Sequence, residues 1–474
     1  MLFNSIEFVI FFIIVTSLYF ALEHKYRWFL LLAASCYFYM AFVPVYILIL
    51  GFTIVIDYYA GILIEQSEGK KRKSWLIVSL IANIGVLAVF KYYNFLNDNL
   101  TFLLGQAGKE NPVPYLSILL PIGLSFHTFQ AMSYTIEVYR GHQKAERNFG
   151  IYALYVMFYP QLVAGPIERP QNLLFQFYAK HSFEINRVIS GLKLMLWGFF
   201  KKLVVADRLA TYVDAAYNYP ENHSGITLIV ATVFFAFQIY CDFSGYSDIA
   251  IGAARVMGFD LMKNFNRPYF ASSISEFWKR WHISLSTWFK DYLYISLGGN
   301  RVAVPRMYFN LFIVFLISGL WHGANWTYVI WGALNGFYLV AAIMRDRFIA
   351  KYKLEIPGSK GAAGKSFNIL FTFVLICFSW IFFRASNVSD AFLIIRKMAS
   401  FDGPLYSTYP TMFFCLLSII MLLAVEAKQE YFKGSFSFMN NRNPVIRYST
   451  YIFLLLMILL MGVFDGGQFI YFQF

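Results

Sequence analysis

A histidine between two strongly apolar stretches is the clearest candidate for chemistry in this sequence. His322 lies in "FLISGLWHGANWTYVIWG", whose apolar flanks place it within or near a bilayer interior. An ionisable side chain is costly there and indicates a functional role. Burial also favours the neutral imidazole, which is the form that a general base requires. The alternative is a structural histidine that packs between helices and hydrogen-bonds a neighbour such as Ser318, and position alone leaves both open.

Two further histidines are weaker candidates. His282 lies in "SEFWKRWHISLSTW", whose arginine, lysine and tryptophan residues resemble an interfacial belt. His127, in "PIGLSFHTFQ", lies in an apolar run and is either a packed core histidine or a cavity-lining one. The other histidines lie in polar surroundings, where a solvated side chain is the expected state.

Other common catalytic patterns do not occur in the sequence. It contains no GxxxxGK[ST] phosphate loop, no GxSxG nucleophile elbow and no HExxH zinc helix. The four cysteines are scattered without a CxxC pair, so we expect no disulfide framework and no metal site. Asp242 and Asp248, six residues apart in "YCDFSGYSDIAIG", could suggest a cation pathway. We favour helix capping and pairing with nearby basic groups for both carboxylates.

The elements that must position these residues are membrane helices. Of the 474 residues, 59% are hydrophobic and only 14% are charged, whereas about 25% are charged in a typical soluble domain. Apolar runs that approach the roughly 17 to 25 residues of a membrane helix recur along nearly the whole chain. Helices satisfy their own backbone hydrogen bonds in lipid. The sequence therefore predicts an all-α integral membrane protein.

Basic loops predict the orientation of the chain in the membrane. We place three of them in the cytoplasm: "KKRK" at 70–73, the loop at 345–353, and the loop with Lys428 to Arg447. The last loop precedes the final apolar segment, so the C-terminus is expected on the opposite side. The net charge of +13 is then a signature of topology rather than of nucleic-acid binding.

One polar, basic and tryptophan-rich stretch interrupts the apolar chain at about residues 260–306. We expect it to form short amphipathic or re-entrant helices on the cytoplasmic face. Another interruption, "FYPQLVAGPIERP" at 158–170, is typical of a broken helix. Without internal repeats or linkers, the sequence predicts a single membrane-embedded domain over 1–474, with a motif-dense core at 121–336 and a C-terminal tail at 465–474.

Three motifs together resemble the membrane-bound O-acyltransferase family. They are "YCDFSGYSDIAIGAARVMGF", "NFNRPYFASSISEFWKRWHISLSTWFKDYLYISLGGNR" and "GLWHGANWTYVIWG". Within the family they are similar to the bacterial branch of alginate and peptidoglycan O-acetyltransferases. The resemblance implies about eleven or more transmembrane helices, with re-entrant and interfacial helices, around a funnel and a tunnel. It also implies that His322 is the essential histidine in the tunnel and that His282 is the other polar position of the site.

The family moves an acyl group from a cytosolic thioester to a hydroxyl group on the other side of the membrane. The resemblance therefore implies acetyl-CoA as donor, with no tightly bound cofactor. A basic, aromatic cytoplasmic surface suits such an anionic donor. The donor-binding candidates on this surface are Trp278, Arg280, Trp281, Lys290 and Asn325.

The chain ends on "FIYFQF" at 469–474, which resembles the ending of family members that act on exported polymers. In them the tyrosine, here Tyr471, is proposed to accept the acyl group and pass it to an extracytoplasmic transferase. Phe469, Phe472 and Phe474 would anchor the tail in an apolar tunnel mouth.

The predicted function is thus an acetyltransferase of the bacterial inner membrane, with His322, His282 and Tyr471 as catalytic residues. It would act with a periplasmic serine-type transferase and modify a polysaccharide indirectly. One alternative is D-alanyl transfer to teichoic acid from a carrier protein. The other is a transporter or flippase, for which many helices, broken segments and buried histidine and aspartate would also be expected.

Overall fold

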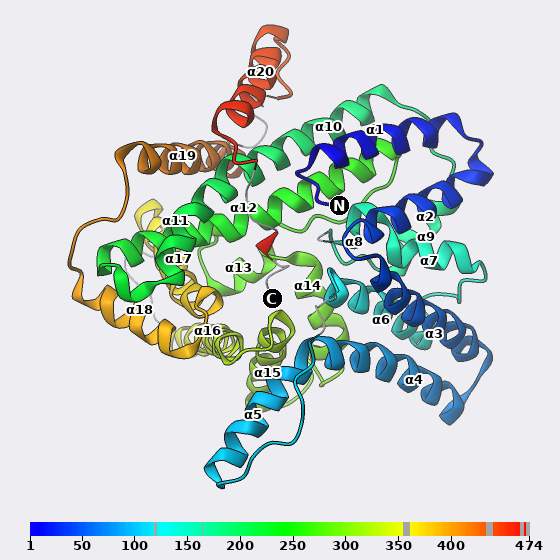
Figure 1. Cartoon of the computed structure of the whole chain (residues 1–474), viewed down its shortest axis with the longest axis horizontal. Coiled ribbons are helices and arrows are strands. Elements are labelled where there is room, and N and C mark those ends of the chain that lie inside the picture. The colour runs from blue at the N-terminus through cyan, green and yellow to red at the C-terminus, as the bar shows by residue number, and fades with distance from the viewer. Residues whose placement is uncertain (118–120, 164, 354–360, 433–438, 465–468, 471–474) are drawn as a thin grey trace. The chain divides into compact units, whose positions relative to one another are not determined.

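The computed structural model describes residues 1–117, 121–163, 165–353, 361–432, 439–464 and 469–470. These residues are helical or irregular, with 78% helix and no strand in this part of the chain (Figure 1). The prediction of an all-α protein is therefore confirmed. The chain divides into two compact units: residues 1–195 with 247–262, and residues 196–246 with 263–474. The single-domain assignment stays a prediction.

Unit 1 holds the N-terminal helices. They are α1 (Ile6–Ala21), α2 (His24–Met40), α3 (Ile47–Gln66), α4 (Gly69–Leu87), α5 (Tyr93–Gln106), α6 (Leu124–Arg140), α7 (Phe149–Met157), α8 (Tyr159–Leu162), α9 (Pro170–Tyr178) and most of α10 (Ile185–Phe199). Helices α3, α4 and α6 pack against one another. The predicted break at 158–170 is present, because helix α7 ends at Met157 and the described residues before α9 contain only the four-residue helix α8.

Unit 2 holds His282 and His322. Its helices are α11 (Asp207–Asn218), the first part of α12 (Gly225–Met257), α13 (Ile274–Arg280), α14 (Ile283–Trp288), α15 (Val304–His322), α16 (Trp326–Tyr352), α17 (Ala362–Arg384), α18 (Val388–Ser400), α19 (Tyr409–Tyr431) and α20 (Pro444–Met461). The expected short helices at 260–306 are α13 and α14, followed by a π-helical segment, η6 (Phe289–Tyr294).

Short irregular helices join several of these elements. The π-helices η2 (Ala88–Tyr92) and η3 (Phe200–Ala206) continue α4 into α5 and α10 into α11. The 3₁₀-helices are η1 (Pro44–Tyr46), η4 (Pro220–Asn222) and η5 (Pro268–Phe270). Each 3₁₀-helix begins with proline, whose fixed φ suits the first helical position.

Eight helical stretches within the described residues are long and apolar enough to cross a membrane. They are Pro44–Gln66, Gly69–Gln106, Gly225–Met257, Val304–His322, Trp326–Tyr352, Ala362–Arg384, Tyr409–Tyr431 and Pro444–Met461. Helix α1 is apolar but only 16 residues long. The chain is thus a multi-pass membrane protein, and the count of eleven or more spans, with re-entrant helices, stays a prediction.

The expectation that Asp242 and Asp248 cap a helix is wrong. Both lie within α12, which continues to Met257, so neither carboxylate is at a helix end. No proline occurs in α12, so the helix continues past both carboxylates. The pairing part of the expectation holds for Asp242, whose carboxylate forms an ion pair with Lys202.

Candidate active site

The tight packing of α15 against α16 positions His322. Gly319 and Gly332 meet where the two helices cross, and a Cβ at Gly332 would lie 2.4 Å from the carbonyl oxygen of Phe315. Small residues let membrane helices approach this closely. Beyond His322 the chain turns at Gly323, where a Cβ would lie 2.1 Å from the ring of Tyr328. The backbone of Gly323 is extended, so helix α15 ends at His322.

Aromatic rings surround the imidazole of His322. The centroids of Trp321, Trp331 and Phe383 lie 4.9, 5.0 and 5.4 Å from that of His322. The residue is 5% exposed. The imidazole therefore lies in a mainly apolar environment. This environment suits a general base and a structural histidine alike, so the catalytic role of His322 stays a prediction.

His282 occupies an unusual backbone conformation at the start of α14. Its φ is 43°, in the left-handed region that residues other than glycine seldom adopt. Such strain persists only where the surrounding structure holds it, and it often marks a functional site. The residue is buried, and this burial lowers the pKa of His282 to about 3. Its imidazole is therefore neutral at physiological pH.

Asn264 fixes which nitrogen of His282 carries the proton. Nδ1 of His282 lies 3.2 Å from Oδ1 of Asn264. The same oxygen accepts hydrogen bonds from the backbone N–H of Ser284 at 3.3 Å and from its hydroxyl at 2.9 Å. A backbone N–H can only donate, so the atom of Asn264 at this point is the oxygen, and Nδ1 of His282 must be its donor. The neutral imidazole then has its lone pair on Nε2.

Trp321 connects the two histidines. Its indole centroid lies 4.9 Å from that of His322 and 6.3 Å from that of His282. The structure thus brings together two histidines that are 40 positions apart in the chain. Sequence reasoning did not identify Asn264 and Trp321 as neighbours of these histidines, although Asn264 lies in "NFNRPYF" and Trp321 in "GLWHGAN".

The two described residues of the C-terminal tail, Phe469 and Ile470, are buried beside this group. The ring centroid of Phe469 lies 4.4 Å from that of Tyr246 and 5.7 Å from that of Phe243. Phe243 in turn contacts His282, with centroids 4.6 Å apart. Phe469 and Ile470 are 0% and 3% exposed. Tyr471, Phe472 and Phe474 lie outside the described residues.

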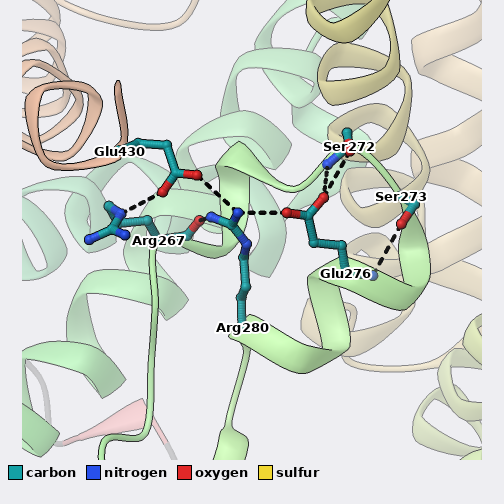
Figure 2. A network of polar contacts seen from close by, with 6 residues as sticks. All are labelled: Arg267, Ser272, Ser273, Glu276, Arg280 and Glu430. Carbon is teal, nitrogen blue, oxygen red and sulfur yellow. Dashed lines mark hydrogen bonds and ion pairs between the residues drawn. The ribbon is translucent and has the colours of Figure 1, made fainter. Parts of the chain in front are cut away.

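Among the donor-binding candidates, Arg280 on α13 belongs to a group of ion pairs. Arg280 forms ion pairs with Glu276 at 2.6 Å and with Glu430 at 2.9 Å, so two carboxylates already hold its guanidinium (Figure 2). Arg267 shares Glu430, at 2.8 Å. Partial burial of Glu276 is outweighed by hydrogen bonds from Ser272 and by the charge of Arg280, which lower the pKa of Glu276.

The remaining donor-binding candidates are scattered. Trp281 is buried against Phe277, and Trp278 packs on Trp331, with centroids 5.5 and 5.8 Å apart. Lys290 is exposed. Asn325 caps α16 by accepting from the N–H of Thr327, and it donates to the carbonyl of Ser386. A role in donor binding stays a prediction for these residues and for Arg280.

Comparison with known proteins matches residues 16–385 to the model of the membrane-bound O-acyltransferase family, MBOAT. The probable alginate O-acetylase AlgI of Pseudomonas aeruginosa is 40% identical over 407 residues, which cover 85% of this chain and 75% of that protein. The peptidoglycan O-acetyltransferase of Helicobacter pylori is 36% identical over 400 residues, 79% of this chain and 74% of that protein. A teichoic acid D-alanyltransferase of Bacillus subtilis is 26% identical over 276 residues, 55% and 68% of the two chains.

Proposed function

Because the chain belongs to the membrane-bound O-acyltransferase family and is an acyltransferase, we propose that it transfers acetyl groups from cytosolic acetyl-CoA. The acetyl group would cross the inner membrane and serve the O-acetylation of an extracytoplasmic polysaccharide. Relatives named for alginate and peptidoglycan acetylation support this substrate class. The transporter alternative is set aside, because the family is one of transferases.

A single observation carries the proposal furthest: Phe469, a described residue of the C-terminal tail, packs beside the group of residues around His282. Phe469 packs on Phe243, and Phe243 packs on His282. Tyr471 follows Phe469 two positions later in the chain. Phe469 is thus separated from His282 by one aromatic ring, which supports a role for the hydroxyl group of Tyr471 at this histidine.

The reaction uses the tail as the first acceptor. The phenolic oxygen of Tyr471 attacks the thioester carbonyl, the carbon–sulfur bond breaks, and the phenolic proton passes through His322 to the leaving thiolate. His282, whose Nε2 carries the lone pair, assists in proton transfer. A phenol has a pKa of about 10, so its ester remains reactive enough for a second transfer. A serine-type transferase on the extracytoplasmic side would take the acetyl group and deliver it to the polysaccharide.

Mass spectrometry of the C-terminal peptide tests the donor and the acceptor together. Incubation of the purified protein with acetyl-CoA is expected to add one acetyl group at Tyr471. The Tyr471→Phe variant is expected to lose this modification and the acetylation of polymer in cells. A matched control is Tyr409→Phe, which changes a tyrosine that is 95% exposed. Normal polymer acetylation in Tyr471→Phe cells would exclude the acyl-tyrosine step.

The His322→Ala variant tests the general base. It is expected to reduce tail acetylation at least 100-fold, which is the lower end of the effect of a positioned base. Circular dichroism and elution from a size-exclusion column check that the variant remains folded. A folded variant with a loss below tenfold would contradict the role of His322.

The similarity to a teichoic acid D-alanyltransferase supports one alternative donor. A D-alanyl thioester on a carrier protein, offered under the same conditions, separates the two possibilities. Labelling of the tail from this donor and not from acetyl-CoA would favour D-alanyl transfer.

A further inference from the structure

A buried ionic cluster lies against the described part of the C-terminal tail. Nζ of Lys202, on η3, lies 2.8 Å from Oδ1 of Asp207 and 2.7 Å from Oδ1 of Asp242. The three side chains are 1 to 5% exposed. Ions that are removed from water to this extent carry a large desolvation cost, so each of their polar atoms needs a partner.

The cluster contains more acceptors than its own cation can satisfy. One ammonium group faces two carboxylates, and both of its contacts are with Oδ1 atoms. Oδ2 of Asp242 instead accepts a hydrogen bond from the backbone N–H of Ile470, at 2.8 Å. The donor that completes Asp242 therefore comes from the tail, and hydrogen bonds to ionised groups are among the stronger ones in proteins.

The segment that leads to the tail is held at the same place. The backbone N–H of Val463 donates to the carbonyl of Leu203, at 3.1 Å. Leu203 belongs to the π-helix η3. In a π-helix the backbone departs from the regular i to i−4 pairing, and such turns are often found at functional sites. Arg208 donates to the carbonyl of Met461 at the end of α20, at 2.5 Å. Three separate hydrogen bonds thus connect the C-terminal segment to η3, α11 and α12.

We propose that Asp242, held by Lys202, is the docking residue for the C-terminal tail and positions it beside His282. Asp242 fixes the backbone at Ile470, and the rings of Tyr246 and Phe243 receive Phe469. Docking by itself requires no acyl transfer. Its consequence, that Asp242 is a positioning residue for acylation of Tyr471, rests on the proposed function.

The two donors that Asp242 contacts require a carboxylate at this position. Lys202 and the N–H of Ile470 are both donors, so the group between them must accept on both oxygens. Asparagine has nearly the same shape but only one oxygen. If that oxygen faces Lys202, its NH₂ group faces the N–H of Ile470. Asp242→Asn is therefore expected to release the tail although it preserves volume.

Hydrogen–deuterium exchange of the full-length protein in lipid nanodiscs tests the docking directly. The C-terminal peptide is expected to exchange about tenfold faster in Asp242→Asn than in the parent protein, the factor expected for one charge-assisted hydrogen bond. Ile470→Pro removes the N–H donor, replaces the side chain and leaves Lys202, Asp207 and Asp242 in place, whereas Ile470→Ala shortens the side chain and keeps the N–H. The proline variant is expected to match Asp242→Asn, and the alanine variant to exchange more slowly than both.

The combination of Asp242→Asn with Ile470→Pro is expected to add no further exchange, because both changes remove the same hydrogen bond. Equal exchange in the parent protein and Asp242→Asn, or equal exchange in the proline and alanine variants, would overturn the docking proposal. Ile470→Pro keeps this test valid even where Asp242→Asn does not fold.

Kinetics separate the docking from the proposed function. The rate of tail acetylation is expected to fall about tenfold in Asp242→Asn at saturating acetyl-CoA, with an unchanged KM for acetyl-CoA. Faster exchange without any acetylation of Tyr471 in the parent protein would retain the docking and exclude the acyl-tyrosine step. A raised KM for acetyl-CoA with normal tail exchange would exclude the positioning role.

Discussion

Unit 2 contains two charged clusters that are built from similar groups but differ in the ratio of cations to carboxylates. In the first, Arg267 and Arg280 face Glu276 and Glu430, two cations against two carboxylates (Figure 2). In the second, Lys202 alone faces Asp207 and Asp242. The first is closed within itself and 13 to 33% exposed, and the second is nearly inaccessible.

The comparison shows two uses of a charged cluster. One cluster pairs its charges among its own side chains, and the other also accepts a hydrogen bond from a distant segment of the chain. In the first cluster each guanidinium pairs with a carboxylate, and each carboxylate has a cation. In the second cluster the N–H of Ile470 supplies a donor from elsewhere in the chain. An excess of acceptors in a buried place is costly until a donor arrives, and this cost favours occupation by the tail.

Removal of the cation from the buried cluster is expected to have the largest effect. Lys202→Met leaves two carboxylates buried without their partner, and the loss of one member of a buried ion pair costs about 3 to 5 kcal/mol. Thermal unfolding in detergent, followed by tryptophan fluorescence, measures the change. The exposed Lys290→Met is the matched control and is expected to change stability by less than about 0.5 kcal/mol. Equal stability of the two variants would contradict the comparison.

The pH dependence of stability should differ in sign between the clusters. Burial and the neighbouring charge of Asp242 outweigh the attraction of Lys202 and raise the pKa of Asp207 to about 7. The folded state then holds a proton that the unfolded state releases near pH 3.9. The contribution of Asp207 to the free energy of unfolding therefore falls as pH rises from about 4 to about 7. Glu276, whose pKa is lowered, instead contributes stability above its usual pKa of about 4.3 and loses it in acid.

Asp207→Asn isolates this contribution. The variant cannot titrate at residue 207, so the decline of unfolding temperature between pH 4 and 7 should become shallower than in the parent protein. Urea or thermal unfolding at several pH values measures the slope. A slope unchanged by the substitution would place the proton elsewhere in the molecule.

The smallest effect is expected in the balanced cluster. Arg280→Met leaves Glu430 with Arg267 and leaves Glu276 with the N–H and hydroxyl of Ser272. Partly exposed pairs of this kind contribute about 1 kcal/mol or less. The same unfolding measurement is expected to show a loss of that size. A loss as large as that of Lys202→Met would mean that balance of charge does not distinguish the clusters.

The sequence allowed much of the architecture to be predicted, because composition constrains membrane helices strongly. Apolar runs predicted a multi-pass helical protein, and the polar stretch at 260–306 predicted the short helices α13 and α14. The helix-capping role of Asp242 was wrong, because no local signal distinguishes a carboxylate in the middle of a long buried helix from one at its end. Asn264 was missed for a similar reason: its role depends on His282, 18 positions away.

By itself, the sequence determined the class of the protein and the positions that deserved attention. Apolar length requires helices in lipid, and histidines in apolar or tryptophan-rich motifs stand out wherever the chain folds. Only the tertiary structure decided which partners these groups meet. Arg280 meets Glu430 150 residues later, and Asp242 meets Ile470 228 residues later. Such pairs depend on how helices pack, and packing combines many weak contacts that no short stretch of sequence contains.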